Sequence, residues 1–357
     1  MSVCMMDILS ENNRMTTPSY TKAEKQLITT LGWFRSRYAL FMGLSLDRNA
    51  DKESIEQFGK AWIGDFKEDW TDTFISLSDK HIIELTPNGY SLTEYGLAVK
   101  NNIDAETPFY KYEYDNYFHM DQQSKAHSAF CEQVYGLDLS QHGLIDQHEL
   151  SFLLELLKKN SAQKILDIGC GNGKITEWIS QTIHTFCVGI DISEEGVRLA
   201  NQRTKNNPLL HFEIGNINDL HSSELYDAIL FLDTLYYSTN IQRTLSQARA
   251  LLKPDARIYA YFSQWIMDEQ YAEGLHYNNT ALAGVLHTLS LPFSCIDLSE
   301  SGRNHWKRKL EVLLAMKEDF IAEGSEQLWE YRYREAYRYA HWGDNKYSRY
   351  LYEIHIP

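Results

Sequence analysis

Three closely spaced glycines end an apolar run in the sequence Lys164-Ile165-Leu166-Asp167-Ile168-Gly169-Cys170-Gly171-Asn172-Gly173-Lys174. After them, Ile175, Trp178, Ile179 and Ile183 recur at helical spacing, so the pattern predicts a strand, a glycine turn and a helix. Glycine tolerates positive φ and lets a ligand approach the backbone, and the N-terminus of a helix offers free N–H groups. We interpret this stretch as a cofactor-binding turn.

The spacing of the glycines separates two classes of cofactor. A dinucleotide-binding turn would have glycine at positions 169, 171 and 174, but position 174 is Lys and the third glycine is Gly173. The second apolar run, Phe186-Cys187-Val188-Gly189-Ile190, ends in Asp191, whose carboxylate can accept both ribose hydroxyl protons. An adenosyl cofactor fits better. An NAD(P)-linked oxidoreductase stays open as an alternative, because it would also use Asp191.

The segment Leu166-Asp167-Ile168-Gly169-Cys170-Gly171-Asn172-Gly173 resembles the first motif of class I S-adenosylmethionine-dependent methyltransferases. The resemblance implies a Rossmann-like α/β sheet of seven strands and S-adenosyl-L-methionine as the cofactor. It also implies that Asp191 binds ribose, that Gly215-Asn216-Ile217 lies beside adenine, and that Asp233 to Tyr237 faces methionine and acceptor. The implied cofactor-binding residues are Asp167, Gly169, Cys170, Gly171, Gly173, Asp191, Ile192, Asn216, Ile217 and Asp233.

The remaining strands are expected in the order that this family has. Tyr226 to Leu232 reads as the fourth strand and Arg257 to Phe262 as the fifth, after a turn at Leu251 to Asp255 that resembles the family's "LLKPGG" turn. We expect residues 263–291 to be mainly helical. Phe293 to Leu298 and an antiparallel Tyr347 to Ile356 would follow as strands six and seven. The methyltransferase domain would span residues 141–357, with a helical insertion at about 300–343 that can build an acceptor pocket.

The N-terminal part of the chain predicts a separate, mostly helical domain at 21–100, preceded by a flexible arm at 1–20. Leu27, Leu31, Phe34, Tyr38 and Phe41 form one apolar helical stripe, and helices are expected at 52–63 and 67–77. The Asn88-Gly89 pair between two apolar runs then predicts a hairpin. Helices followed by a hairpin resemble the winged-helix dimerisation domain of small-molecule O-methyltransferases, which implies a homodimer. The stripe from Leu27 to Phe41 is also more apolar than such a unit needs, so we expect residues 20–100 to form most of the dimer contact.

Residues 101–140 are expected to form a linker and a cap helix. We predict that Asn101-Asn102 and Pro108 break regular structure, and residues 109–118 are dense in aromatic and acidic side chains. A helix is predicted at Gln123 to Tyr135. The aromatic side chains can face a substrate or can pack one domain on the other, and the sequence leaves both readings open.

Composition narrows the class of partner. The chain has 357 residues with Lys plus Arg 34 and Asp plus Glu 49, and the net charge of -15 opposes binding to nucleic acid. The acidic excess in the third predicted helix also argues against DNA. The five cysteines are scattered without metal-ligand spacing, and we find no apolar run of membrane-spanning length and no signal peptide. We therefore expect a cytoplasmic protein with no bound metal and no membrane partner.

Catalysis of methyl transfer needs a general base only when the acceptor loses a proton as it attacks. The candidate bases are His142, His127 and His305, with Tyr236 and Tyr237 as orienting groups. The pair His142-Gly143 resembles the "H-x-G" segment before the first motif in sterol and tocopherol methyltransferases, which implies a place at the methionine end of the cofactor.

From these candidates we predict a catalytic set of His142, Tyr237 and His305. The predicted function is S-adenosylmethionine-dependent methyl transfer to an O, N or C centre of a small-molecule acceptor. A non-catalytic S-adenosylmethionine-binding regulator that uses the winged helix stays open.

Overall fold

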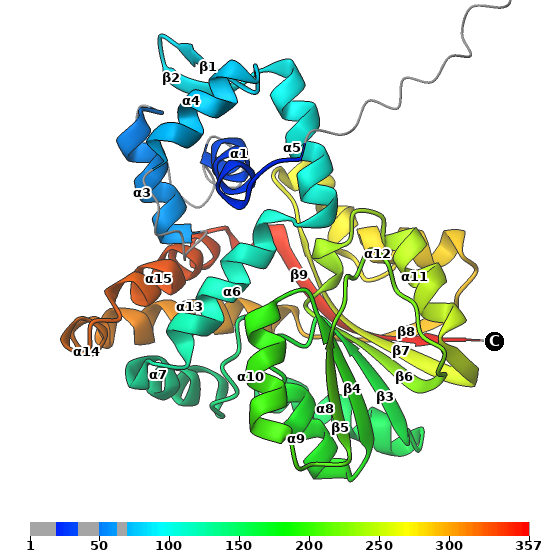
Figure 1. The fold of residues 1–357 in the computed structure, drawn as a ribbon. Coiled ribbons are helices and arrows are strands. Elements are labelled where there is room, and N and C mark those ends of the chain that lie inside the picture. Colours follow the sequence, from blue (N-terminus) through cyan, green and yellow to red (C-terminus); the bar gives the residue numbers. More distant parts are fainter. Residues whose placement is uncertain (1–18, 35–49, 63–69, 357) are drawn as a thin grey trace, which may run out of the picture. The chain divides into compact units, whose positions relative to one another are not determined.

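The computed structural model describes residues 19–34, 50–62 and 70–356, and these form two compact units. Described residues up to Thr107 belong to the first unit, and the second begins at Pro108. Figure 1 draws both units in the colours of the sequence. None of the helices in the described ranges is long and apolar enough to cross a membrane.

The first unit consists of helices followed by a hairpin and one more helix. Its elements are α1 (Lys22–Phe34), α3 (Lys52–Trp62), α4 (Thr71–Asp79), β1 (Ile83–Thr86), β2 (Gly89–Leu92) and α5 (Glu94–Glu106). Helix α1 packs among α3, α4 and α5. The hairpin predicted from Asn88-Gly89 is confirmed, and Gly89 has the positive φ of 95° that such a turn requires.

The apolar stripe of the first predicted helix is buried as far as the structure describes it. Leu27 and Phe34 are almost fully inaccessible to solvent, and Leu31 is also buried. Tyr38 and Phe41 lie outside the described residues, as does the start of the third predicted helix at Lys67. The described part of the stripe therefore leaves no apolar surface for a partner to cover.

The expected break in regular structure at Asn101-Asn102 is wrong. Helix α5 runs through both asparagines and ends only at Glu106, before Pro108. The Thr93 hydroxyl accepts a hydrogen bond from the Gly96 N–H and caps the start of the helix, and Ile103 is buried. Asparagine costs a helix well under about 1 kcal/mol, which the cap and the buried side chains offset.

The second unit is built on a seven-stranded sheet with the strand order β5-β4-β3-β6-β7-β9-β8. Only β9 runs antiparallel to its neighbours. The strands are β3 (Lys164–Ile168), β4 (Phe186–Asp191), β5 (Leu210–Ile214), β6 (Tyr226–Leu232), β7 (Leu252–Trp265), β8 (Phe293–Asp297) and β9 (Tyr347–His355). The predicted Rossmann-like sheet with an antiparallel last strand is confirmed. The strand order reverses between β3 and β6, where the ligands of open α/β sheets bind.

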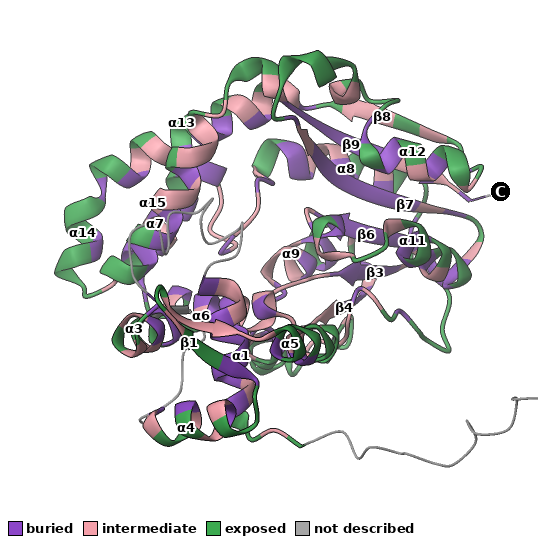
Figure 2. Ribbon diagram, turned by 90° about the horizontal axis from the view of Figure 1, so that it is seen from above, coloured by how far each residue is buried: buried purple, intermediate pink, exposed green. Residues whose placement is uncertain are grey.

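Helices cover both faces of this sheet. The apolar sides of α8 (Gln147–Lys159) and α9 (Lys174–Ile183) join one core cluster, and those of α11 (Ile241–Ala250) and α12 (Ala281–Thr288) join another. Helix α10 (Glu194–Thr204) packs against β4 and β5. Figure 2 shows the central strands buried and the covering helices exposed on their outer sides.

The fifth strand is longer than the sequence predicted, and the segment after it is less helical. Strand β7 continues past Phe262 to Trp265 because it pairs with β9 as far as Trp265 opposite Tyr347. Between β7 and β8 the regular elements are a short 3₁₀ segment at Glu269–Leu275 and helix α12.

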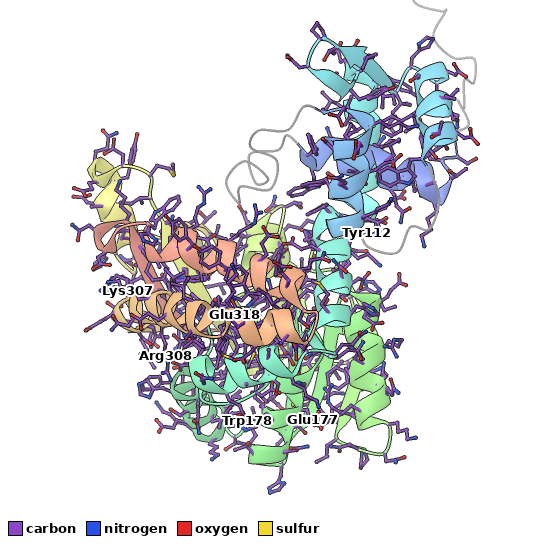
Figure 3. The ribbon with its side chains drawn as sticks, turned by 90° about the vertical axis from the view of Figure 1, so that its left-hand side faces the viewer. Tyr112, Glu177, Trp178, Lys307, Arg308 and Glu318 are labelled. Carbon is purple, nitrogen blue, oxygen red and sulfur yellow. The ribbon has the colours of Figure 1, made fainter. Side chains whose placement is uncertain are left out.

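The other helices of the second unit lie in two segments of the chain. Helices α6 (Phe109–Asp121) and α7 (Lys125–Tyr135) precede the first strand of the sheet in the sequence. Helices α13 (Ser299–Ala315), α14 (Lys317–Ala322) and α15 (Glu326–Ala340) lie between β8 and β9. Helix α15 packs on α6, and α13 packs on α7 and β9. Figure 3 labels Lys307 and Arg308, which are exposed on α13. The next residue, Lys309, is fully buried and its Nζ lies 3.1 Å from the Glu335 carboxylate.

Candidate active site

The glycine turn after β3 is fixed to the end of β4 by backbone hydrogen bonds. The N–H groups of Gly169 and Cys170 both donate to the Ile190 carbonyl, at 2.8 and 3.1 Å. Gly169 and Gly171 have positive φ values of 82° and 57°. A Cβ on Gly169 would lie 2.5 Å from the Thr234 side chain, so glycine is required here both by conformation and by space.

The Asp191 carboxylate closes the turn from the neighbouring strand. One oxygen accepts from the Gly171 N–H at 2.7 Å, and the other accepts from the Ser193 N–H at 2.8 Å. Burial, with a smaller contribution from Asp115, raises the pKa of Asp191 to about 6. Asp191 is therefore ionised at neutral pH and lies beside the backbone of the glycine turn.

A cavity of about 460 Å³ opens at this carboxyl edge of the sheet. Of the cofactor-binding residues predicted from the sequence, Gly169, Cys170, Gly171, Asp191, Ile192, Ile217 and Asp233 line it. The structure thus brings the glycine turn, the end of β4 and the end of β6 to one wall.

Three predicted cofactor-binding residues do not line this cavity. Asp167 is buried under the turn, where one carboxylate oxygen accepts from the Thr176 hydroxyl at 2.6 Å, and its burial raises its pKa to about 7. A Cβ on Gly173 would lie 2.6 Å from the Phe212 ring, so this glycine serves close packing. Asn216 binds the Asn218 N–H, and its neighbour Gly215 lines the cavity instead.

Asp233 belongs to a buried group of charges that sequence reasoning missed. Both oxygens of its carboxylate accept from the Arg349 guanidinium, and one of them also accepts from the Leu144 N–H at 3.1 Å. The same guanidinium binds Glu149, with a shortest distance of 2.8 Å. Asp233 is held in a left-handed conformation with φ 60°. The Asp233 carboxylate therefore pairs with Arg349. Through its hydrogen bond to the Leu144 N–H, it also positions the segment that carries His142.

Asp146 and Glu149, at the start of helix α8, have different partners. The Asp146 carboxylate accepts from the Glu149 N–H at 2.8 Å, which caps helix α8. The Glu149 side chain turns to Arg349 instead of the cap.

His142 and Tyr237, two members of the predicted catalytic set, line the cavity together. His142 Nδ1 lies 3.2 Å from the Tyr114 hydroxyl, and Nε2 lies 2.7 Å from the Tyr331 hydroxyl. The Tyr114 hydroxyl is also hydrogen-bonded to the Tyr237 hydroxyl. Burial lowers the pKa of His142 to about 3, so the imidazole is neutral. The predicted orienting residue Tyr236 lines the cavity as well.

The structure does not bring the other two candidate bases to the cavity. His305 is buried with its ring centroid 4.8 Å from that of Tyr135, and burial lowers its pKa far below the usual range. His127 is fully buried with Nδ1 2.6 Å from the Asp121 carboxylate. Although burial opposes the charged form, Cys131 and Asp121 raise the pKa of His127 to about 9. An imidazolium cannot accept a proton, so His127 does not fit the role of base.

Aromatic side chains form the rest of the cavity wall. Tyr110 and Tyr114 come from α6, within the aromatic segment singled out from the sequence, and Trp265, Trp306 and Tyr339 come from β7 and the insertion. Side chains of the insertion therefore line this cavity. Within the described ranges, no group of three or more His, Cys, Asp or Glu side chains is placed to hold a metal ion.

The residues present fit an adenosyl cofactor. The glycine turn provides backbone without Cβ atoms along one wall, and the ionised Asp191 stands beside it. Among the described residues, the buried Tyr110 hydroxyl has no hydrogen-bond partner and belongs to the same wall. Its pKa is raised to about 12 by burial and by nearby Asp191, so it remains a hydrogen-bond donor. The fold and this cavity define an α/β protein that binds a small ligand at its topological switch point.

Comparisons with known proteins agree with this class. Residues 159–318 match the family described as a methyltransferase domain. A sterol 24-C-methyltransferase of Clavispora lusitaniae is 23% identical over 240 residues, which are 62% of this chain and 60% of that protein. A ubiquinone biosynthesis O-methyltransferase of Haemophilus ducreyi is 28% identical over 104 residues, 27% of this chain and 44% of that protein. This chain thus spans under two thirds of the length of these relatives.

A solved structure shows the same fold. Phosphoethanolamine N-methyltransferase 2 of Haemonchus contortus, in complex with S-adenosyl-L-methionine, superposes with a TM-score of 0.51 at 13% identity. The superposition covers 64% of this chain and 59% of that one. The chain carries a class I S-adenosylmethionine-dependent methyltransferase domain, as the glycine turn predicted.

Proposed function

We propose that the protein transfers a methyl group from S-adenosyl-L-methionine to an O, N or C centre of a small-molecule acceptor. The observation that supports this most directly is the cavity that the glycine turn, Asp191 and the His142 segment line together. The relatives named above methylate small molecules by their printed names, which favours the same class of acceptor.

The chain's contribution to the reaction is alignment and exclusion of water. When bound, the cofactor supplies a methyl group activated by a positively charged sulfur. Asp191 would hold the ribose and the turn at Gly169 and Gly171 would follow the cofactor. The aromatic wall keeps the site dry and, through the electron-rich ring faces, favours a cation by about 0.5–2 kcal/mol. Tyr237 and His142, which line the same cavity, would orient the acceptor.

Calorimetric titration of the purified chain is the test of the proposed function. We expect S-adenosyl-L-methionine and S-adenosylhomocysteine to bind with one site per chain, and NAD and NADP to bind at least tenfold more weakly, because Lys174 replaces the third glycine of a dinucleotide turn. Tighter binding of a dinucleotide would favour the oxidoreductase alternative. Binding of S-adenosylmethionine without methylation of any acceptor in a cell extract would favour the regulator.

For the N-terminal unit we propose a winged-helix-like module that mediates a homodimer in the cytoplasm, without nucleic acid or membrane as partner. Its helices followed by a hairpin support the module, and the free thiols of Cys131, Cys170, Cys187 and Cys295 suit a reducing compartment. The dimer rests on the resemblance alone, since the described stripe from Leu27 to Phe34 is already buried. We expect light scattering at low micromolar concentration to give twice the chain's mass, and a mass of one chain would contradict it.

A further inference from the structure

His142 belongs to a continuous line of hydrogen bonds that reaches from the cavity into the protein interior. On one side its Nδ1 meets the Tyr114 hydroxyl, which in turn meets the Tyr237 hydroxyl. On the other side its Nε2 lies 2.7 Å from the Tyr331 hydroxyl, which donates to the Glu113 carboxylate at 2.8 Å. The residues come from α6, α15 and the segments before α8 and after β6, so the line forms only in the folded chain.

The direction of these hydrogen bonds follows from the number of protons each group carries. A carboxylate accepts and does not donate, so Tyr331 gives its one hydroxyl proton to Glu113. The Tyr331 oxygen must then accept from Nε2–H of His142. In a neutral imidazole this leaves Nδ1 as an acceptor for the Tyr114 hydroxyl. Tyr114 in turn accepts from Tyr237, and every bond donates toward Glu113.

The two ends of the line lie in different surroundings. Tyr237, Tyr114 and His142 line the cavity, whereas Tyr331 and Glu113 do not line it and are both buried. A proton that enters at a tyrosine hydroxyl in the cavity can therefore be passed inward by successive transfers, and it ends on a carboxylate that is shielded from solvent.

We propose that Tyr237, Tyr114, His142, Tyr331 and Glu113 form a proton relay, and that the methyl acceptor is consequently a phenol or a similarly acidic enol. The proposal rests on the proposed function. As the acceptor oxygen forms its bond to the methyl carbon, the acceptor O–H proton moves to the relay, and the carbon–sulfur bond breaks with its electron pair left on sulfur. Each relay member passes on its own proton, and the Glu113 carboxylate takes up the last one.

The relay favours an acidic acceptor because the proton ends on a carboxylate. Transfer of the acceptor proton to the Glu113 carboxylate is less unfavourable when the acceptor is a stronger acid. A phenol has a pKa near that of unperturbed tyrosine, about 10, and is a far stronger acid than an aliphatic alcohol. The rings of Tyr110, Trp265 and Tyr339 in the cavity wall also suit a flat aromatic acceptor.

The charges around His142 favour passing the proton on over retaining it. Glu335 and Arg332 face His142 from α15, Lys309 from α13, His127 from α7 and Glu113, by way of Tyr331, from α6. Burial is the main cause of the lowered pKa of His142, and the three cations lower it further against the opposing effect of Glu335. These charges therefore disfavour a proton that stays on His142. The cofactor's positive charge and the negative charge of Glu113 are lost in the same step, so the closed site gains no net charge.

The tautomer of His142 can be measured without any cofactor. In protein labelled with ¹⁵N-histidine, we expect the His142 signals to show Nε2 protonated and Nδ1 unprotonated. Tyr331→Phe removes the acceptor for Nε2–H and is expected to give a mixture of tautomers. Tyr333→Phe, on the same helix but stacked on Trp329 with ring centroids 4.8 Å apart, is the matched control and should leave the tautomer unchanged. A proton on Nδ1 in the wild type, or an unchanged tautomer in Tyr331→Phe, would overturn the relay.

Glu113→Gln tests the proton acceptor through the acidity of the methyl acceptor. The probes are 4-methylphenol, which is neutral at pH 7.5, and 4-nitrophenol, which is largely ionised there. We expect kcat for 4-methylphenol to fall at least about a hundredfold in Glu113→Gln, and kcat for 4-nitrophenol to change less than about threefold. Calorimetric affinity for S-adenosylhomocysteine should stay within about twofold. Equal losses on both phenols, or a wild type that binds the cofactor and methylates neither, would overturn the proposal. Failure of the wild type to bind the cofactor would instead contradict the proposed function, and the tautomer measurement would still stand.

Discussion

Methionine in place of Arg349 is expected to lower the free energy of unfolding by about 3–5 kcal/mol. The Arg349 guanidinium is fully buried between the carboxylates of Glu149 and Asp233, with closest approaches at or below 2.8 Å. Methionine would leave both carboxylates in the interior without a cation. Burial, with a further contribution from Asp233, already raises the pKa of Glu149 to about 7, although Arg349 opposes this. Removing Arg349 would therefore force protonation of at least one of the two acids.

Chemical unfolding in urea at pH 7.5, followed by circular dichroism, measures this loss. Arg243→Met, an exposed arginine on α11, is the control and should change stability by less than about 0.5 kcal/mol. Adding Glu149→Gln to Arg349→Met should recover part of the loss, because it removes one of the stranded charges. A urea midpoint for Arg349→Met equal to that of the wild type would show that these charges do not stabilise the fold.

The Arg349 group also shows where prediction from the sequence stops. Arg349 and Glu149 are 200 positions apart, and no local pattern in strand β9 marks one arginine among its tyrosines. The glycine turn, by contrast, could be predicted because its cause is local. Positive φ and close packing against Thr234 and Phe212 require glycine at those positions whatever the rest of the chain does. Local requirements leave a signature in sequence, and pairings across the sheet do not.

The side of the cavity that carries His142 could be predicted from the sequence only in part. His142 could be found because the pair His142-Gly143 precedes the first motif at a familiar place, and a Cβ on Gly143 would lie 2.9 Å from the Asp233 carboxylate. Its partner Tyr331 is 189 positions away on α15, among other tyrosines of the same helix. The sequence of α15 contains several tyrosines and does not show which ring reaches the histidine. His305 is also a histidine, but it is buried against Tyr135 away from the cavity, and the sequence did not distinguish it from His142.

Alanine in place of Asp191 is expected to weaken S-adenosyl-L-methionine binding by at least about tenfold. Each hydrogen bond between a ribose hydroxyl and an ionised carboxylate is worth about 1.5–3 kcal/mol, and about 1.4 kcal/mol corresponds to a factor of ten. The carboxylate also accepts from the N–H groups of Gly171 and Ser193, so alanine would loosen the turn in addition. Isothermal titration calorimetry measures the change. Glu213→Ala, an exposed carboxylate on the adjacent strand β5, is the control and should bind as the wild type does.

The pH dependence of binding distinguishes the carboxylate's charge from its shape. The pKa of Asp191 is raised to about 6 by burial, against the N–H groups of Ser193 and Gly171, which favour the ionised form. Below about pH 6 the wild type must give up a proton to accept both ribose hydroxyls, so its affinity should fall as the pH decreases to 5. Asp191→Asn has no proton to give up and should show no such fall, while binding more weakly than the wild type at pH 7.5. Because the cofactor's own ionisable groups affect both proteins equally, the difference between the two profiles belongs to Asp191. Parallel profiles, or unchanged affinity in Asp191→Ala, would show that the ribose is held elsewhere in the cavity.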